Sequence, residues 1–111
     1  MKGNEVFKHA VKRMGEAALG ALKQAGLEKD QVDYLIPHQA NLRIIDATGE
    51  RLNLPKEKVV ANINKYGNMS VATIPVALHE LIEEGKLQTG QIIVMVAFGA
   101  GFTWASAVYR W

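Results

Sequence analysis

Apolar residues recur at helical spacing near the start of the chain. They are Val6, Phe7, Ala10, Met14, Ala17, Ala18, Ala21 and Leu22. The pattern predicts an amphipathic helix that begins at Asn4, a suitable N-cap, runs to about Ala25 and is ended by Gly26. Lysines and arginines on its other side are typical of a solvated face.

A short apolar run, Tyr34 to Ile36, predicts a buried strand. Pro37 ends it, because proline has no N–H to donate to a sheet. His38 follows at the carboxyl end of this strand. A second helix is predicted over residues 40–52, with Leu42, Ile45 and Leu52 on its apolar side.

The second half of the chain continues the alternation of strands and helices. We predict a strand over 59–63, a helix over 70–84 ended by Gly85, a buried strand over 91–97 and a final antiparallel strand over 102–110. The helix over 70–84 is apolar nearly all round in its first three turns. Such a helix must be buried all round, which one small sheet cannot provide, so the pattern predicts a missing neighbour.

Strands alternating with helices in 111 residues predict a single α/β domain of three layers, residues 1–111. The net charge is +2, and the pI near 9.0 comes without a basic run or an aromatic ladder, so it is weak support for nucleic-acid binding. No apolar run approaches the ~18 residues of a membrane span, and the start of the chain lacks a signal-peptide core. The expected compartment is the cytoplasm.

The chain has no cysteine, which excludes disulfides, thiolate metal sites and a cysteine nucleophile on this chain. Three widely separated histidines, His9, His38 and His79, give no metal signature. A single histidine after a strand is most often an ordinary loop residue. His38 therefore gains meaning only if other motifs accompany it.

Two further motifs do so: Gly67-Asn68 before the apolar helix, and Phe98-Gly99-Ala100-Gly101-Phe102-Thr103-Trp104 between the last two strands. Together with Pro37-His38-Gln39-Ala40-Asn41, they make the chain resemble the C-terminal half of β-ketoacyl-acyl-carrier-protein synthase III. The resemblance runs from about Gly3 to Trp111. That family has the thiolase-like fold and initiates type II fatty acid synthesis by decarboxylative condensation.

The resemblance implies a five-stranded mixed sheet of order 3-2-4-5-1, whose last strand is antiparallel and whose first strand is missing here. It implies a missing N-terminal half that carries the family's cysteine nucleophile, and a homodimeric parent enzyme. No cofactor is permanently bound; coenzyme A thioesters and phosphopantetheine are the implied substrates. This chain alone is expected to be inactive in condensation.

The resemblance also assigns roles to residues. His38 and Asn68, thirty positions apart, match the pair whose N–H groups stabilise the enolate oxygen formed by decarboxylation. The backbone N–H of Ala100 matches the oxyanion hole for acyl transfer. Ala40, Asn41 and Phe98 match the substrate-binding positions. Arg43 and Arg51 match or adjoin the docking patch for acyl carrier protein, an acidic partner.

Alternatives remain open for each motif. The sequence departs from the family at Ala100, Glu50 and Met69. Without the resemblance, residues 99–101 would favour an ordinary tight turn. Without it, the two arginines would indicate only the solvated face of a helix. The alternative function is a non-catalytic module that binds acyl carrier protein or pantetheine. The catalytic hypothesis predicts that Nε2 of His38 and Nδ2 of Asn68 lie within ~6 Å of each other, with His38 neutral.

Overall fold

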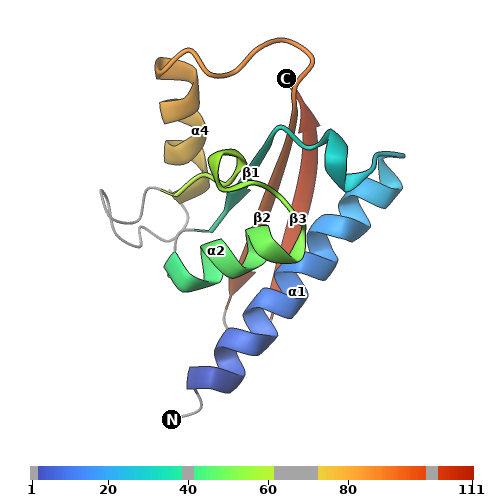
Figure 1. Ribbon diagram of the computed structural model, residues 1–111, viewed down its shortest axis with the longest axis vertical. Coiled ribbons are helices and arrows are strands. Elements are labelled where there is room, and N and C mark those ends of the chain that lie inside the picture. Colours follow the sequence, from blue (N-terminus) through green and yellow to red (C-terminus); the bar gives the residue numbers. More distant parts are fainter. Residues whose placement is uncertain (1–2, 39–41, 62–72, 100–102) are drawn as a thin grey trace.

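The computed structural model describes residues 3–38, 42–61, 73–99 and 103–111. In chain order its elements are α1 (Gly3–Gln24), η1 (Lys29–Gln31), β1 (Tyr34–Pro37), α2 (Leu42–Arg51), η2 (Lys56–Lys58), α4 (Thr73–Glu83), β2 (Ile92–Gly99) and β3 (Thr103–Arg110). The strands form one sheet in the order β1-β2-β3, with β1 parallel and β3 antiparallel to β2 (Figure 1).

The sheet separates two sets of apolar side chains, because successive residues of a strand point to opposite faces. Leu35, Val94 and Val96 pack with α1 and α2, whereas Ile36 and Ile93 pack with α4. Figure 1 shows α1 and α2 in front of the strands and α4 apart from them. The predicted three-layer α/β arrangement with an antiparallel last strand is therefore confirmed.

The first helix follows the predicted stripe closely. Met14, Ala18 and Leu22 are its most buried residues. It ends as predicted at Gly26, whose φ of 73° is readily adopted only by glycine. The Leu27 N–H donates to the Leu22 carbonyl at 2.9 Å and completes a Schellman motif.

The predicted start of α1 is wrong by a small margin. The helix begins at Gly3, so Asn4 lies inside its first turn instead of capping it. An N-cap contributes only about 1 kcal/mol to helix stability. A capping residue therefore predicts the start of a helix less reliably than an apolar stripe predicts its buried face.

The predicted strand over residues 59–63 is not formed in its described part. Val59 makes a single parallel bridge with Leu35, and the Val60 N–H donates to the Leu35 carbonyl at 2.9 Å. Residues 62 and 63 lie outside the described residues. The bridge places this segment beside β1, on the side away from β2, as the expected strand order requires.

The burial of α4 is one-sided, as its apolar sequence and the small size of the sheet predict. Ala77 and Leu81 are buried against the sheet, but Ile82 is 44% exposed. Beside α4, the side chains of Leu78, Ile93, Met95, Tyr109 and Trp111 surround an open apolar hollow. This chain therefore covers one side of α4 and leaves apolar surface on the other.

Candidate functional site

His38 is fixed at the carboxyl edge of the sheet by its own backbone. Its N–H donates to the Val96 carbonyl at 2.8 Å, one step beyond the pairing of Pro37 with Val96. The chain enters α2 four residues later, at Leu42. Because β1 and β2 are parallel, both end at this edge, which is the lower end of the sheet in Figure 1. Ligands of α/β sheets usually bind at such an edge.

The surroundings of His38 favour its uncharged form. The side chain is half-buried, and burial lowers the pKa of its imidazole from the usual 6.5. A neutral imidazole keeps one N–H as a hydrogen-bond donor and has no need to lose it. At neutral pH His38 is therefore suited to stabilise a developing negative charge on a substrate oxygen.

The carboxyl end of β2 and the start of β3 lie at the same edge as His38. Phe98 pairs with Trp104, and Gly99 pairs with Thr103 at the last step of the ladder. The backbone of Phe98 is therefore close to the carboxyl end of β1. The strand ends that flank residues 100–102 are thus brought to the edge where His38 lies.

Several predicted site residues are not placed. Ala40, Asn41, Asn68 and Ala100 lie outside the described residues. The predicted separation of His38 from Asn68 and the predicted oxyanion hole therefore stay predictions.

The two predicted docking arginines are both exposed on α2. Arg43 lies in the first turn of the helix, next to the edge that carries His38, and Arg51 is its last residue. Eight residues of helix place them about 12 Å apart along the axis. Glu50 lies beside Arg51 and is also exposed, so the surface is not uniformly basic.

Sequence reasoning missed one aromatic residue at this site. Phe7 was assigned to the apolar stripe of the first helix, but its ring centroid lies 4.7 Å from the Cζ atom of Arg43. This is within the range of a cation–π interaction. Residues so far apart in the sequence carry no local signal for such a contact, so only the packing of α1 against α2 shows it.

The other histidines lie away from this edge or at the surface. His79 of α4 lies 3.7 Å from Glu83, and both side chains are 68% exposed. Among the described residues, no three His, Cys, Asp or Glu side chains are grouped so that they could hold a metal ion. In the same residues, no helix is long and apolar enough to span a membrane.

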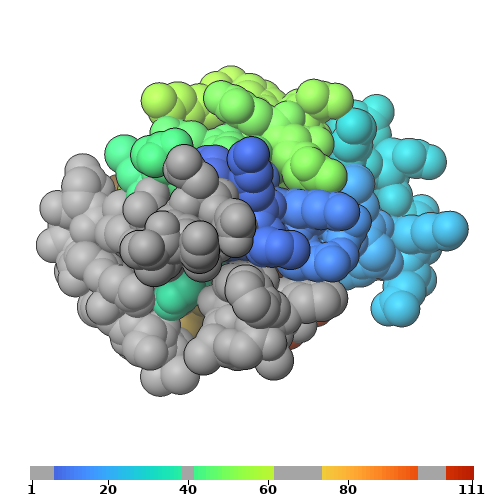
Figure 2. Space-filling view, turned by 90° about the horizontal axis from the view of Figure 1, so that it is seen from below, coloured from blue at the N-terminus to red at the C-terminus, as the bar shows by residue number. Residues whose placement is uncertain are grey.

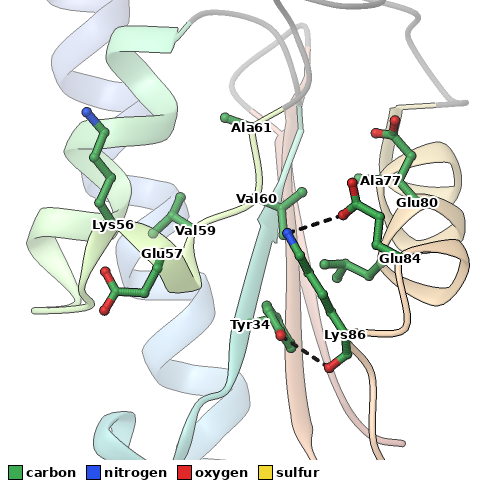
Figure 3. A pocket seen from close by; sticks show the side chains of 11 residues that line it. Tyr34, Lys56, Glu57, Val59, Val60, Ala61, Ala77, Glu80, Glu84 and Lys86 are labelled. Atoms are coloured by element: carbon green, nitrogen blue, oxygen red, sulfur yellow. Dashed lines mark hydrogen bonds and ion pairs between the residues drawn. The ribbon is translucent and has the colours of Figure 1, made fainter.

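A second hollow, of about 520 Å³, lies between residues 56–61 and α4 (Figure 3). On its wall the Tyr34 hydroxyl donates to the Lys86 carbonyl at 3.2 Å, and Lys86 pairs with Glu84 at 3.2 Å. Tyr34 begins β1, whereas Ala61, which also lines the hollow, follows the parallel bridge of Val59 with Leu35. The hollow therefore runs along β1 toward the edge that carries His38.

Comparison with known proteins gives the same family as the motifs. A family model described as 3-oxoacyl-[acyl-carrier-protein (ACP)] synthase III C terminal matches residues 22–111. Beta-ketoacyl-[acyl-carrier-protein] synthase III of Bacillus pumilus is 54% identical over all 111 residues. The chain spans 36% of the length of that relative.

Solved structures agree with this result. The crystal structure of 3-oxoacyl-[acyl-carrier-protein] synthase III from Aquifex aeolicus matches the whole chain with a TM-score of 0.95 and 53% identity, and the chain covers 36% of it. The corresponding structure from Thermus thermophilus gives a TM-score of 0.94 at 51% identity, and the chain covers 35% of it. The chain thus has a thiolase-like fold and belongs to the family of 3-oxoacyl-[acyl-carrier-protein] synthase III C-terminal regions.

Proposed function

We propose that this chain supplies the decarboxylation site of a condensing enzyme that acts in type II fatty acid synthesis. The observation that carries the proposal is the position of His38, which is half-buried at the carboxyl edge of the sheet, where its backbone N–H donates to the Val96 carbonyl at 2.8 Å. Burial lowers the pKa of its imidazole, which favours the uncharged form. The motif match assigns Asn68 as its partner.

The chemistry requires donors that stay protonated. When a malonyl thioester loses carbon dioxide, the electrons of the broken C–C bond form an enolate, and negative charge develops on the thioester oxygen. The imidazole N–H of His38 and the side-chain amide of Asn68 would donate to that oxygen. Both stabilise the transition state more than the ground state, because the charge is largely absent before the bond breaks.

The second half of the reaction needs an acylated thiol, which this chain lacks. The enolate carbon attacks an acyl thioester, a new C–C bond forms and a thiolate leaves. The chain has no cysteine, so the acylated thiol must come from elsewhere in the enzyme. We propose that the N–H of Ala100 stabilises the oxyanion of this step, and that Ala40, Asn41 and Phe98 hold the phosphopantetheine arm.

The proposed partner is acyl carrier protein, which carries the malonyl group. An acidic protein would approach the edge that holds His38 from the side of α2, where Arg43 and Arg51 are exposed. The proposed substrates are thioesters of coenzyme A and of phosphopantetheine. None of these steps needs a permanently bound cofactor.

A chimera tests the proposal. The segment of the Bacillus pumilus relative that matches this chain is replaced by residues 1–111, and carbon dioxide release from malonyl-acyl carrier protein is measured with condensation. We expect the chimera to release carbon dioxide and to condense its substrates. We expect no condensation by the chain alone, and none in a mixture that lacks the malonyl thioester. The size and thermal transition of the chimera, compared with those of the relative, show whether it is assembled.

One result would favour the non-catalytic alternative. An assembled chimera that binds acyl carrier protein but releases no carbon dioxide would contradict the decarboxylation site and leave only a binding module. Condensation by the pure chain alone would contradict the assignment of the nucleophile to another part of the enzyme.

A further inference from the structure

Helix α1 holds the first of the two exposed arginines of α2. The Cζ atom of Arg43 lies 4.7 Å from the centre of the Phe7 ring, although the two residues belong to different helices. A guanidinium that stacks on an aromatic face retains its hydrogen-bond donors around the rim. Contact with the Phe7 ring therefore restrains the Arg43 guanidinium without using its N–H donors.

The second arginine is held by α1 in another way. Gly15 is buried inside α1, and a Cβ atom built there would lie 2.5 Å from Cδ of Arg51 and 3.0 Å from its Nε. The stem of Arg51 thus crosses the backbone of α1 where a side chain is lacking. Gly20 of the same helix is exposed and has nothing within 4 Å of the corresponding position.

The two contacts are in register. Phe7 and Gly15 are eight residues apart on α1, and Arg43 and Arg51 are eight residues apart on α2. Eight residues span about 12 Å of helix, so α1 supports the two guanidinium groups at a matching spacing. Figure 2 looks onto this end of the molecule and shows α1, in blue, directly beside α2, in green.

Arg13, a third arginine of this region, is engaged differently. It belongs to α1 and pairs with Glu16 of the same helix at 2.9 Å.

We propose that Phe7 and Gly15 are positioning residues that preset Arg43 and Arg51 for an acidic helix of a partner protein. The fitting partner presents carboxylates about 12 Å apart, which is two turns and a fraction along a helix. Presetting matters because a free arginine loses rotamer freedom when it binds, and a held one loses less. This inference rests on the proposed docking of acyl carrier protein, and adds which residues of α1 make it efficient.

Substitution at Gly15 separates positioning from folding. In Gly15→Ala the new methyl group displaces the flexible end of Arg51, while alanine favours the helix more than glycine does. We expect the dissociation constant for acyl carrier protein to rise about three- to tenfold with an unchanged or higher melting temperature. Gly20→Ala is the matched control: it gains the same helix propensity and should leave binding unchanged.

Substitution at Phe7 supplies an independent test. Phe7→Leu keeps apolar bulk but removes the aromatic face, and should weaken binding about two- to fivefold. Phe7→Tyr keeps the face and should bind as the unsubstituted chain does. Binding is measured by calorimetry on both the chain and the chimera. In the chimera, Gly15→Ala should raise the KM for malonyl-acyl carrier protein without lowering kcat.

The outcomes distinguish this inference from the proposed function. If Arg43→Ala and Arg51→Ala weaken binding but Gly15→Ala behaves like Gly20→Ala, positioning by α1 is wrong and docking stands. If the arginine substitutions leave binding unchanged, docking itself is wrong. Equal binding of duplex DNA and acyl carrier protein at the same ionic strength would show an unspecific basic surface and overturn the inference.

Discussion

The two faces of the sheet differ in how completely this chain covers them. On the face of α1 and α2, the buried set comprises Met14, Ala18, Leu22, Val32, Leu35, Leu52, Val94 and Val96. On the face of α4, the buried set within the described part of the chain is smaller and comprises Ile36, Ala77, Leu81 and Ile93. The first face has its own core, whereas the second has an apolar helix with one side open.

This difference suggests that the two faces contribute differently to stability and to association. Burial of apolar surface is the main stabilising term, so the free energy of unfolding should depend mostly on the face of α1 and α2. The open face of α4 has exposed apolar groups, which favours association with another apolar protein surface or with another copy of the chain. His38 lies at the carboxyl edge of the sheet, which borders both faces.

The largest expected effect is on stability. Leu22→Ala removes a side chain that is 2% exposed in the core of α1 and should lower the free energy of unfolding by about 3 kcal/mol. Ile82→Ala, on the open side of α4, should change it by less than about 1 kcal/mol, since that side chain is 44% exposed. Urea denaturation measures both. Equal losses would show that the two faces contribute equally and break the comparison.

A comparable effect is expected on catalysis without loss of stability. In the chimera, His38→Ala and Asn68→Ala should each slow carbon dioxide release about 100-fold, near 3 kcal/mol, because each removes one proposed donor to the enolate oxygen. The melting temperature serves as the control. Full activity in either variant would remove that residue from the proposed pair.

A smaller effect is expected on association of the chain. Ile82→Lys places a charge on the exposed side of α4, and Tyr109→Lys places one on the wall of the open apolar hollow, where Tyr109 is 53% exposed. Both should reduce self-association and binding of a hydrophobic dye, measured by light scattering and fluorescence. Leu19→Lys, on α1 at 40% exposure, is the matched control. A monomeric parent chain that binds no dye would contradict this prediction.

The smallest effect concerns pH. Since burial lowers the pKa of His38 below 6.5 in the folded chain, the unfolded chain takes up this proton first as pH falls. Stability should therefore decrease as pH drops below 6.5 and level off below the folded pKa. NMR titration of the imidazole gives the folded midpoint directly. The decrease in stability that is due to His38 should be absent in His38→Gln. An NMR midpoint above 6.5 would contradict the lowered pKa of the imidazole.

The sequence by itself determined the main elements and the candidate chemistry. Periodicity located α1 and β1, and glycine ended α1 at Gly26 because few other residues accept its positive φ. The order of the motifs was enough to identify the family. Each motif lies at the end of a strand or the start of a helix, so its position along the chain can be read from the sequence.

The tertiary structure decided what depends on contacts between distant residues. The half-burial that lowers the pKa of His38 comes from packing at the sheet edge and has no local signal. The same holds for the contact of Phe7 with Arg43 and the passage of Arg51 over Gly15, which exist only because α1 and α2 lie side by side. A periodic pattern records which face of a helix is apolar, but not which partner meets that face. It therefore predicted that one small sheet would leave α4 partly uncovered, and only the tertiary structure showed that Ile82 lies on the open side.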